Sequence, residues 1–292
     1  MLMANTYALK PLVITPAVTC FIGAYDPPTK ENKGFVSNVC TVDTGKSIVV
    51  IEAGPTYRFA KELNAYIAAH SGKKVEAVIV TNFHDDRYTG ASYYKEKHIP
   101  IITHKTLPEE LKKHPEKFTR IPKVTTKEEY AGSKVVQPDI LTDDTYIIKG
   151  AARTIEILKL SKGSNSTSDI AVYVPSEDFI FVGNTVFNGR FIKYGKYSHM
   201  DAWIKALEVL EKMHVKYVMG GHGAAHGSDA YKENLDYLKL LRASVKKAYE
   251  NDMDREDVRP TVQDEAFSHF KHFKEIAPAN VRNYYDYLEW AE

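Results

Sequence analysis

Polar side chains that could hold a metal ion follow the apolar run at residues 75–80, in the stretch TNFHDDRYTG at 81–90. In an extended loop, side chains at positions i, i+2 and i+4 point to the same side. Asn82, His84 and Asp86 would therefore converge, and an imidazole beside a carboxylate is a common part of a metal site. A polar loop without any such role has a similar composition, so the spacing alone leaves both interpretations open.

A second histidine, His222, is flanked by glycine residues that could turn its side chain toward a ligand. His222 follows the apolar run at 215–219 and stands in the stretch GGHGAAHG. Glycine permits sharp backbone bends. Such bends turn a side chain into a cleft, so we expect His222 to be presented to a ligand and not packed in the core.

The elements that must position these residues alternate between strands and helices. Strands are expected at 18–24, 35–43, 46–53, 75–81 and 100–104, and later in the runs TYIIKG, TIEILKL, DIAVYVP, DFIFVG and VKYVMGG. Helical spacing of apolar residues predicts helices at 57–70, 90–97, 199–213, 229–249 and 261–272 and at the C-terminus. Two successive halves of strands followed by helices predict an α/β protein with two sheets packed face to face and helices outside.

Composition excludes some classes of partner. The chain of 292 residues has 39 basic and 38 acidic side chains, so no charge excess favours nucleic acid or an anionic membrane. No apolar stretch is long enough for a membrane span, and Pro16 interrupts the longest one near the N-terminus. We expect a cytoplasmic protein, although a periplasmic form whose leader had been removed would have the same sequence.

The two cysteines, Cys20 and Cys40, lie inside strand-like runs. Buried cysteine packs like a small hydrophobic residue, so reduced core thiols are expected. A disulfide would require their two strands to be neighbours.

The order of strands, polar loop and Gly-His-Gly turn resembles the metallo-β-lactamase superfamily over roughly residues 15–245. In that family the polar loop reads His-x-His-x-Asp-His. The stretches GKSIVVIEAGP at 45–55 and NSTSDIAVYVPSEDFIFVGNTVF at 165–187 resemble two further family motifs. The resemblance implies an αββα four-layer sandwich over residues 1–245, with residues 246–292 as a helical extension packed on the same domain. It also implies an active site built from loops along one edge of the two sheets.

The resemblance assigns metal ligands, and asparagine stands at three of the assigned positions. The first metal site would consist of Asn82, His84 and Asn165, and the second of Asp86, Asn184 and His222. The motif gives histidine at position 165 and aspartate or cysteine at position 184. A neutral amide oxygen is a poor zinc ligand. Weaker zinc binding than in the family is therefore expected.

The hypothesis we favour from the sequence is a hydrolase-like protein that acts on an ester, thioester or amide of a small molecule. It would hold at most one divalent ion, with zinc as the expected metal, on Asp86 and His222, and His84, Asn82 and Asn184 are the other candidate ligands. His84 would act as general base and Asp86 as ligand and orienting group. Arg87, Asn165 and Asn184 would contact the substrate.

The alternative hypothesis is a pocket without a metal, which would make the chain a pseudoenzyme or a ligand-binding protein. Its three asparagines would form a hydrogen-bonded network around His84, Asp86, Arg87 and His222. Arg87, which replaces the last histidine of the family's loop, would supply the positive charge that a metal gives elsewhere.

Two further surfaces have open roles. The lysine-rich segment 104–123 lies where the family often carries a segment over the active site. It could attract an anionic substrate or form a solvated face. Near the C-terminus, Tyr284, Tyr287, Leu288 and Ala291 form a helical stripe that could pack on the domain or on a second copy in a homo-oligomer.

Overall fold

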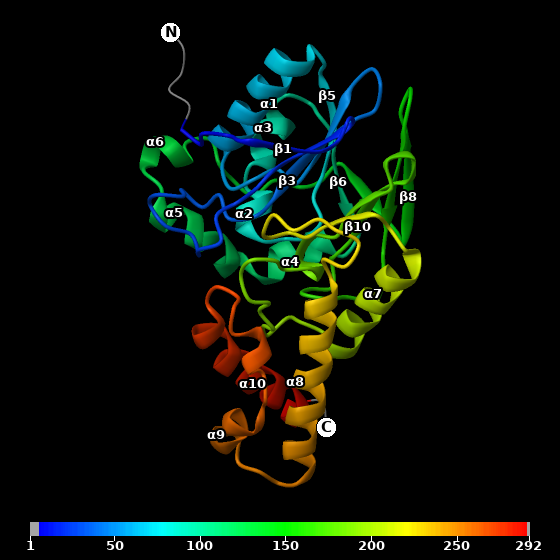
Figure 1. The fold of residues 1–292 in the computed structure, drawn as a ribbon. Helices are drawn as coiled ribbons and strands as arrows, with labels where there is room; N and C mark the ends of the chain where they lie inside the picture. Colours follow the sequence, from blue (N-terminus) through cyan, green and yellow to red (C-terminus); the bar gives the residue numbers. More distant parts are fainter. Residues whose placement is uncertain (1–5, 291–292) are drawn as a thin grey trace.

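The computed structural model describes residues 6–290 as two β-sheets packed face to face between layers of helices (Figure 1). The first sheet has the strand order β1-β2-β3-β4-β5-β6-β7 and the second has the order β12-β11-β10-β9-β8. The strands of the first sheet are β1 (Pro11–Thr15), β2 (Val18–Phe21), β3 (Val39–Asp43), β4 (Ile48–Ile51), β5 (Val75–Ile79), β6 (Ile101–His104) and β7 (Ile140–Thr142). Those of the second are β8 (Thr145–Lys149), β9 (Thr154–Leu158), β10 (Ala171–Val174), β11 (Phe179–Phe181) and β12 (Tyr217–Met219). The predicted αββα sandwich is confirmed.

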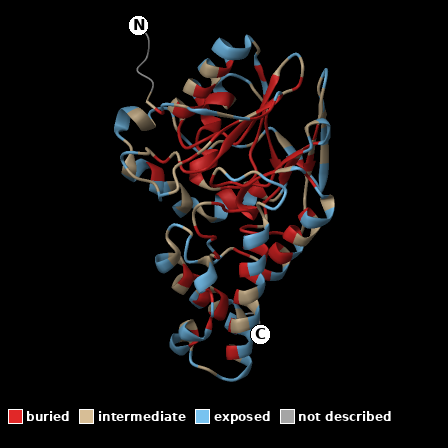
Figure 2. Ribbon diagram, viewed as in Figure 1, coloured by how far each residue is buried: buried red, intermediate tan, exposed pale blue. Residues whose placement is uncertain are grey.

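The core between the sheets follows from alternation along the strands. Val42, Ile51 and Ile79 of the first sheet share one buried cluster with Val172 and Phe181 of the second. Figure 2 shows the buried residues concentrated in the strands and in the helix faces that cover them. Strand β4 pairs in parallel with β5, and β11 with β12. The loops after β4 and β5 therefore leave the first sheet at one edge, and the loops after β11 and β12 leave the second sheet at one edge.

Helices cover the outer face of each sheet. The first sheet carries α1 (Tyr57–Ser71) and α3 (Ala91–Glu96), the second carries α7 (Met200–Met213) and α8 (Lys232–Glu250), and α10 (Phe273–Trp290) packs on α8. In α1, buried Phe59, Leu63 and Ile67 recur every fourth residue, so one face of the helix packs on the sheet. Within residues 6–290, no helix combines the length and the apolar character that crossing a membrane requires.

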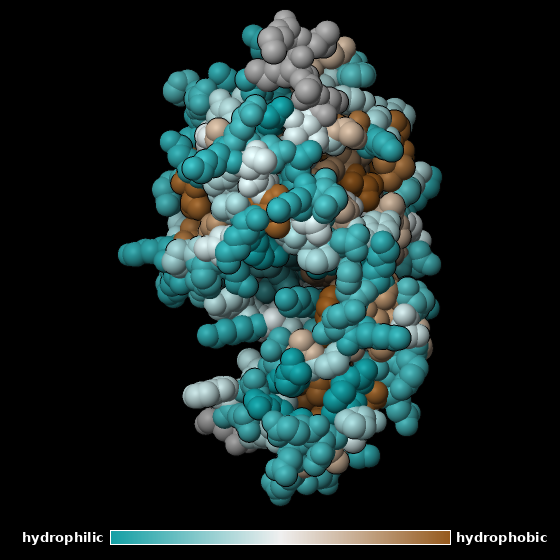
Figure 3. Space-filling model, turned by 90° about the vertical axis from the view of Figure 1, so that its left-hand side faces the viewer, coloured by the Kyte–Doolittle hydropathy of each residue, from teal (hydrophilic) through white to brown (hydrophobic). Residues whose placement is uncertain are grey.

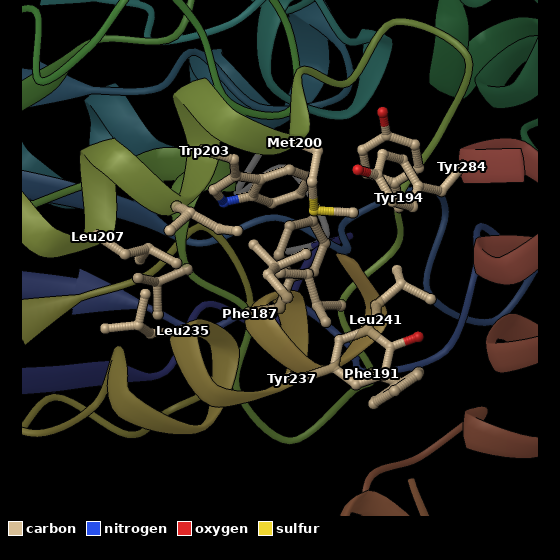
Figure 4. Close-up of a cluster of buried hydrophobic side chains, with 14 of the residues drawn as sticks. Phe187, Phe191, Tyr194, Met200, Trp203, Leu207, Leu235, Tyr237, Leu241 and Tyr284 are labelled. Carbon is tan, nitrogen blue, oxygen red and sulfur yellow. The ribbon is translucent and has the colours of Figure 1, made fainter. Parts of the chain in front are cut away.

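A cluster of aromatic and aliphatic side chains fixes the helical layer of the second sheet (Figure 4). Trp203 of α7 is fully buried and its Nε1 donates to the Thr185 carbonyl at 2.8 Å. Phe187 packs in the same cluster, together with Leu235 and Tyr237 of α8. The loop after β11 is thereby held on a rigid base.

The lysine-rich segment consists of short helices instead of one continuous element. These are α4 (Leu107–Lys113), α5 (Arg120–Val124) and α6 (Lys127–Tyr130), with the 3-10 turn η1 (Pro115–Thr119) between the first two. The preceding helix α2 (Asp85–Tyr88) is also a single turn. Asp85 accepts from Arg120 Nε at 3.1 Å, which ties this segment to the polar loop.

The helix expected at 261–272 is wrong. The short helix α9 (Arg255–Val258) and the 3-10 turn η4 (Arg259–Thr261) lead into this segment, which itself contains the 3-10 turn η5 (Glu265–Phe267). The aromatic residues in this segment recur every third position, and turns with backbone hydrogen bonds between residues i and i+3 have the same repeat. Phe270 N donates to the Phe267 carbonyl, and Phe273 N to that of Phe270. His272 has a φ of 63°, in the left-handed region, and separates these turns from α10.

The C-terminal stripe divides between the core and solvent. Tyr284 is buried against α8 and Leu288 packs at the edge of the same cluster, whereas Tyr287 is 43% exposed. Ala291 lies outside the described residues. The stripe therefore serves mainly to pack α10 on the second sheet's helical layer.

The expectation of two reduced thiols is also wrong, because Cys20 and Cys40 form a disulfide. Strands β2 and β3 are antiparallel neighbours, and their register pairs Cys20 directly with Cys40. Directly opposed residues of such strands have Cβ atoms about 4.5–5.5 Å apart. Both cysteines are fully buried. The sequence did not reveal this pairing because it did not fix the register of the two strands.

Removing the disulfide is expected to lower the free energy of unfolding by about 3 kcal/mol, because a cross-link over a loop of this size restricts the unfolded chain. The double variant Cys20→Ala/Cys40→Ala should show this loss in urea denaturation. Thiol titration of the unreduced, unfolded wild type is the control and should find no free thiol. Two titratable thiols would contradict the assignment.

Candidate functional site

Five of the residues selected from the sequence line one pocket at the common edge of the two sheets. It has a volume of about 260 Å³. His84 comes from the loop after β5, Asp86 from the helical turn α2, and Asn165 from the loop between β9 and β10. Asn184 follows β11 and His222 follows β12. The lining residues contributed by other segments include Lys117, Arg120, Phe187, Arg190, Lys193, Lys196 and Tyr197.

Asn82 is fully buried and does not line the pocket. Its Nδ2 donates to Asp169 Oδ1 at 2.6 Å and to Ser166 Oγ at 3.2 Å, and its Oδ1 accepts from the His84 backbone at 3.1 Å. The helical turn α2 begins at Asp85, so the extended alternation ends at His84. Asn82 thus fastens the loop at 164–169 to the end of β5.

Arg87 is fully buried behind the pocket wall, and its guanidinium joins both sheets. Nη1 donates to Glu52 Oε1 at 3.0 Å, and Nη2 donates to Asn184 Oδ1 at 2.6 Å. The same Nη2 lies 3.5 Å from His222 Nε2, and Nε lies 3.9 Å from Asp86 Oδ1. The cation therefore lies among Asp86, Asn184 and His222, the three residues assigned to the second metal site.

Glu52 is the buried acidic partner of Arg87. It has a φ of 71°, which is strained for a residue with a side chain, and it accepts from the hydroxyl and the backbone N–H of Thr81. Burial raises the pKa of Glu52 to about 7, against the opposing charge of Arg87. Gly183 has no room for a Cβ, because Thr81 Oγ1 occupies that space, so glycine allows the loop after β11 to approach this ion pair.

The ring nitrogens of the two histidines have defined partners. His222 Nδ1 lies 2.7 Å from the Val36 carbonyl, so Nδ1 carries the proton and the Nε2 lone pair faces Arg87. Its ring stacks on Phe187 with centroids 4.8 Å apart. Asn184 Nδ2 lies 3.2 Å from His84 Nδ1. Burial holds the pKa of both imidazoles well below the ordinary value, and nearby arginines act in the same direction.

Asp86 is the buried acceptor of the pocket. Burial alone would raise its pKa, but the charges of Arg87 and Arg120 outweigh this effect and hold the pKa well below its usual range. Its Oδ1 lies 3.6 Å from Arg120 Nη2, yet it has no hydrogen-bond donor among residues 6–290. A buried acceptor without a donor is costly. Asp86 is therefore ready to accept a hydrogen bond from a ligand.

Comparison with known families and structures agrees with this architecture. The family model described as the metallo-β-lactamase superfamily matches residues 32–247. The chain belongs to the metallo-β-lactamase superfamily.

Solved structures of the superfamily share the fold at low sequence identity. A metallo-β-lactamase from Pontibacter korlensis has a TM-score of 0.65 and 18% identity, and the match covers 79% of this chain and 99% of that one. The DIM-1 metallo-β-lactamase has a TM-score of 0.63 and 16% identity, over 79% and 97%. VMB-1 has a TM-score of 0.64 and 18% identity, over 80% and 97%. At these identities the likeness shows the fold alone.

The donor set of this chain does not fit the metal sites implied by the superfamily. Within the described part of the chain, no three His, Cys, Asp or Glu side chains are grouped so that they could hold an ion. Asn184 directs its oxygen at Arg87 and its N–H groups at His84 and Asn165. An N–H group cannot ligate a cation, and the Arg87 guanidinium takes one of the two lone pairs of the Asn184 oxygen and places a positive charge 2.6 Å from it.

Several site residues were not found from the sequence. Arg120 and Lys117 belong to the lysine-rich segment, for which attraction of an anionic substrate was one of two interpretations. Arg190, Lys193 and Lys196 lie in the loop at 188–198, and no periodicity or motif marked them. Glu52 lies inside the run GKSIVVIEAGP, which the sequence marked only as a family motif, and its pairing with Arg87 depends on contacts across the site.

Arg87→Met is expected to lower the free energy of unfolding by about 3–5 kcal/mol, because it leaves Glu52 buried without its cation. Adding Glu52→Leu should recover part of this loss, since no unpaired charge remains. Urea denaturation measures both effects. Arg242→Met, which breaks an exposed pair with Asp201, is the control and should change stability by less than about 1 kcal/mol. Equal losses for Arg87→Met and Arg242→Met would contradict the role of the buried pair.

The pKa values of His84 and His222 are expected to lie well below the ordinary value, because burial disfavours the charged forms of both rings. The unfolded chain binds protons at these positions below about pH 6.5, so their contribution to stability is lost as the pH falls below that value. Imidazole Cε1–H shifts, assigned through His84→Asn and His222→Asn, measure this directly. A midpoint near 6.5 for either ring would contradict the expectation.

Proposed function

We propose that this chain binds a small anionic molecule in the cleft and uses Arg87, instead of a metal ion, as the fixed positive charge of the site. The observation that supports this most strongly is the position of the guanidinium among Asp86, Asn184 and His222. This is the metal-free alternative that the sequence left open.

The polar network supports the proposal because both the oxygen and the nitrogen of the Asn184 amide have hydrogen-bond partners. The amide oxygen accepts from Arg87, and the amide nitrogen donates to His84 Nδ1 and to Asn165 Oδ1, each at 3.2 Å. An aspartate at this position would have no hydrogens to donate, and a cysteine would offer no such pair of contacts. Asparagine is thus the residue that a guanidinium-centred site requires there.

The charges that face the pocket support an anionic ligand. Lys117, Arg120, Arg190, Lys193 and Lys196 line it, against the carboxylates of Asp86 and Glu116. A cleft with an excess of one sign concentrates ligands of the opposite sign. His84 and Asn165 would orient the ligand from the pocket floor.

Hydrolysis with one zinc ion on Asp86 and His222 is the competing function. It would require Arg87 to leave Asn184 and His222, because a guanidinium and a divalent cation at the same ligands repel each other. Leaving would also strip Glu52 of its buried partner. The present geometry therefore favours the site without a metal.

Wild-type protein purified without chelator and without a nickel column is expected to contain no stoichiometric zinc and to bind none in calorimetric titration. The double variant Arg87→His/Asn184→Asp removes the guanidinium and supplies an imidazole and a carboxylate, so it should gain zinc binding. Elemental analysis and calorimetry measure both proteins, with circular dichroism as a check on folding.

Stoichiometric zinc in the wild type, located by anomalous scattering between Asp86 and His222, would overturn the proposal. Loss of hydrolysis of an ester or thioester on adding chelator to that protein would then support the metal-dependent hydrolase.

A further inference from the structure

The mouth of the cleft has positive charges that the protein leaves unpaired. Of the five cationic side chains that line it, Arg120 forms an ion pair with Asp85. Within the part of the chain that the structure describes, the other four, Lys117, Arg190, Lys193 and Lys196, form no ion pair. Two carboxylates, Asp86 and Glu116, line the same pocket. An excess of two positive charges therefore faces the ligand.

These cations converge from two separate segments. Lys117 lies in η1, whereas Arg190 and Lys193 belong to the loop after β11. Partial burial lowers the pKa of Lys117 and of Lys193, and the charge of Arg120 lowers both further. All three side chains line the same pocket of about 260 Å³. Their positive charges therefore face one confined space that a compact anion can fill.

Aromatic rings fix the directions of these side chains. The Lys117 ammonium lies 4.6 Å from the centroid of the Tyr197 ring. The Arg190 guanidinium carbon lies 6.0 Å from the centroid of Phe187, which also stacks on His222. Arg190 Nε is buried and has no acceptor among the described residues. A donor held in this way gains a partner when an anion binds.

The floor of the pocket presents a hydrogen-bond acceptor instead of positive charges. Asp86 Oδ1 is a buried acceptor without a donor, and Asp86 is only 3% exposed. A ligand that fills the pocket would supply a hydroxyl or an amine hydrogen. A hydroxyl fits better than an ammonium, because Arg87 and Arg120 already place two positive charges within 4 Å of Asp86.

We propose that the ligand is a phosphate monoester of a small hydroxylated molecule, with its phosphate on Lys117, Arg190 and Lys193 and a hydroxyl on Asp86. A phosphate monoester carries a charge of about −1.5 to −2 at pH 7 and three acceptor oxygens, which matches the charge excess and the convergent donors. A pocket of about 260 Å³ is smaller than the sites of drug-sized ligands and suits a molecule of this size.

The inference rests on the proposed function, and a ligand panel separates the two. Calorimetry on the wild type would compare glycerol 3-phosphate with inorganic phosphate, glycerol and succinate at low salt. Glycerol 3-phosphate is expected to bind most tightly, inorganic phosphate more weakly, and glycerol not at all. Binding should weaken as salt is added.

Single substitutions test where the phosphate and the hydroxyl of the ligand bind. Lys117→Ala and Lys193→Ala should each weaken glycerol 3-phosphate binding by roughly tenfold or more, the size expected for a lost charge-assisted hydrogen bond. Lys112→Ala is the matched control, since this exposed lysine lies in the same segment and does not line the pocket. Asp86→Ala should abolish the preference for glycerol 3-phosphate over inorganic phosphate.

Each outcome has a distinct meaning. Equal or tighter binding of succinate, with the wild type still free of zinc, would overturn the phosphate monoester and leave the proposed anion-binding function standing. Equal losses for Lys112→Ala and Lys193→Ala would overturn the placement of the phosphate. Failure of every anion to bind would overturn both proposals.

Discussion

One buried cation organises the site of this protein. The guanidinium of Arg87 reaches Glu52 at the end of β4, Asn184 after β11 and His222 after β12. It therefore connects loops from both sheets at the edge where they meet. A charge of this kind is tolerated in a protein interior only when its partners surround it, so each neighbour is constrained in turn. Glu52 adopts a left-handed backbone, and Gly183 lacks the side chain that would block the contact.

The asparagines are best understood as part of this arrangement. A site centred on a metal uses lone pairs alone, whereas a site centred on a guanidinium needs acceptors near the cation and donors farther out. Asn184 supplies both in one side chain, and Asn82 does the same between Asp169 and the His84 backbone. Each of the three asparagines is thus joined to its neighbours by hydrogen bonds. In this scheme Asp86 lacks a donor from the protein, which makes it the natural point of contact for a ligand.

Much of the architecture followed from the sequence because its signals are local. The alternating strands, the helix expected at 57–70 and the glycine-flanked His222 each depend on a few adjacent residues. Five residues that the family motifs marked line one pocket. Features set by contacts between distant segments were missed. The Cys20–Cys40 disulfide depends on strand register, and the inward turn of Asn82 depends on where α2 begins. The threefold spacing of Phe267, Phe270 and Phe273 suited 3-10 turns as well as an α-helix. The cations at 188–198 have no motif, since a charged loop becomes a binding site only through what it faces.

The packing of Trp203 also allows the site to be followed by intrinsic tryptophan fluorescence. The chain has two tryptophans, and their surroundings differ strongly, because Trp203 is fully buried whereas Trp290 is 88% exposed. The indole N–H of Trp203 donates to the carbonyl of Thr185, the residue next to Asn184. A shift of the loop after β11 changes the polarity around one indole and leaves the other unaltered. Quenching Trp290 with an aqueous quencher therefore isolates an intrinsic fluorophore that reports on the Asn184 loop without any label.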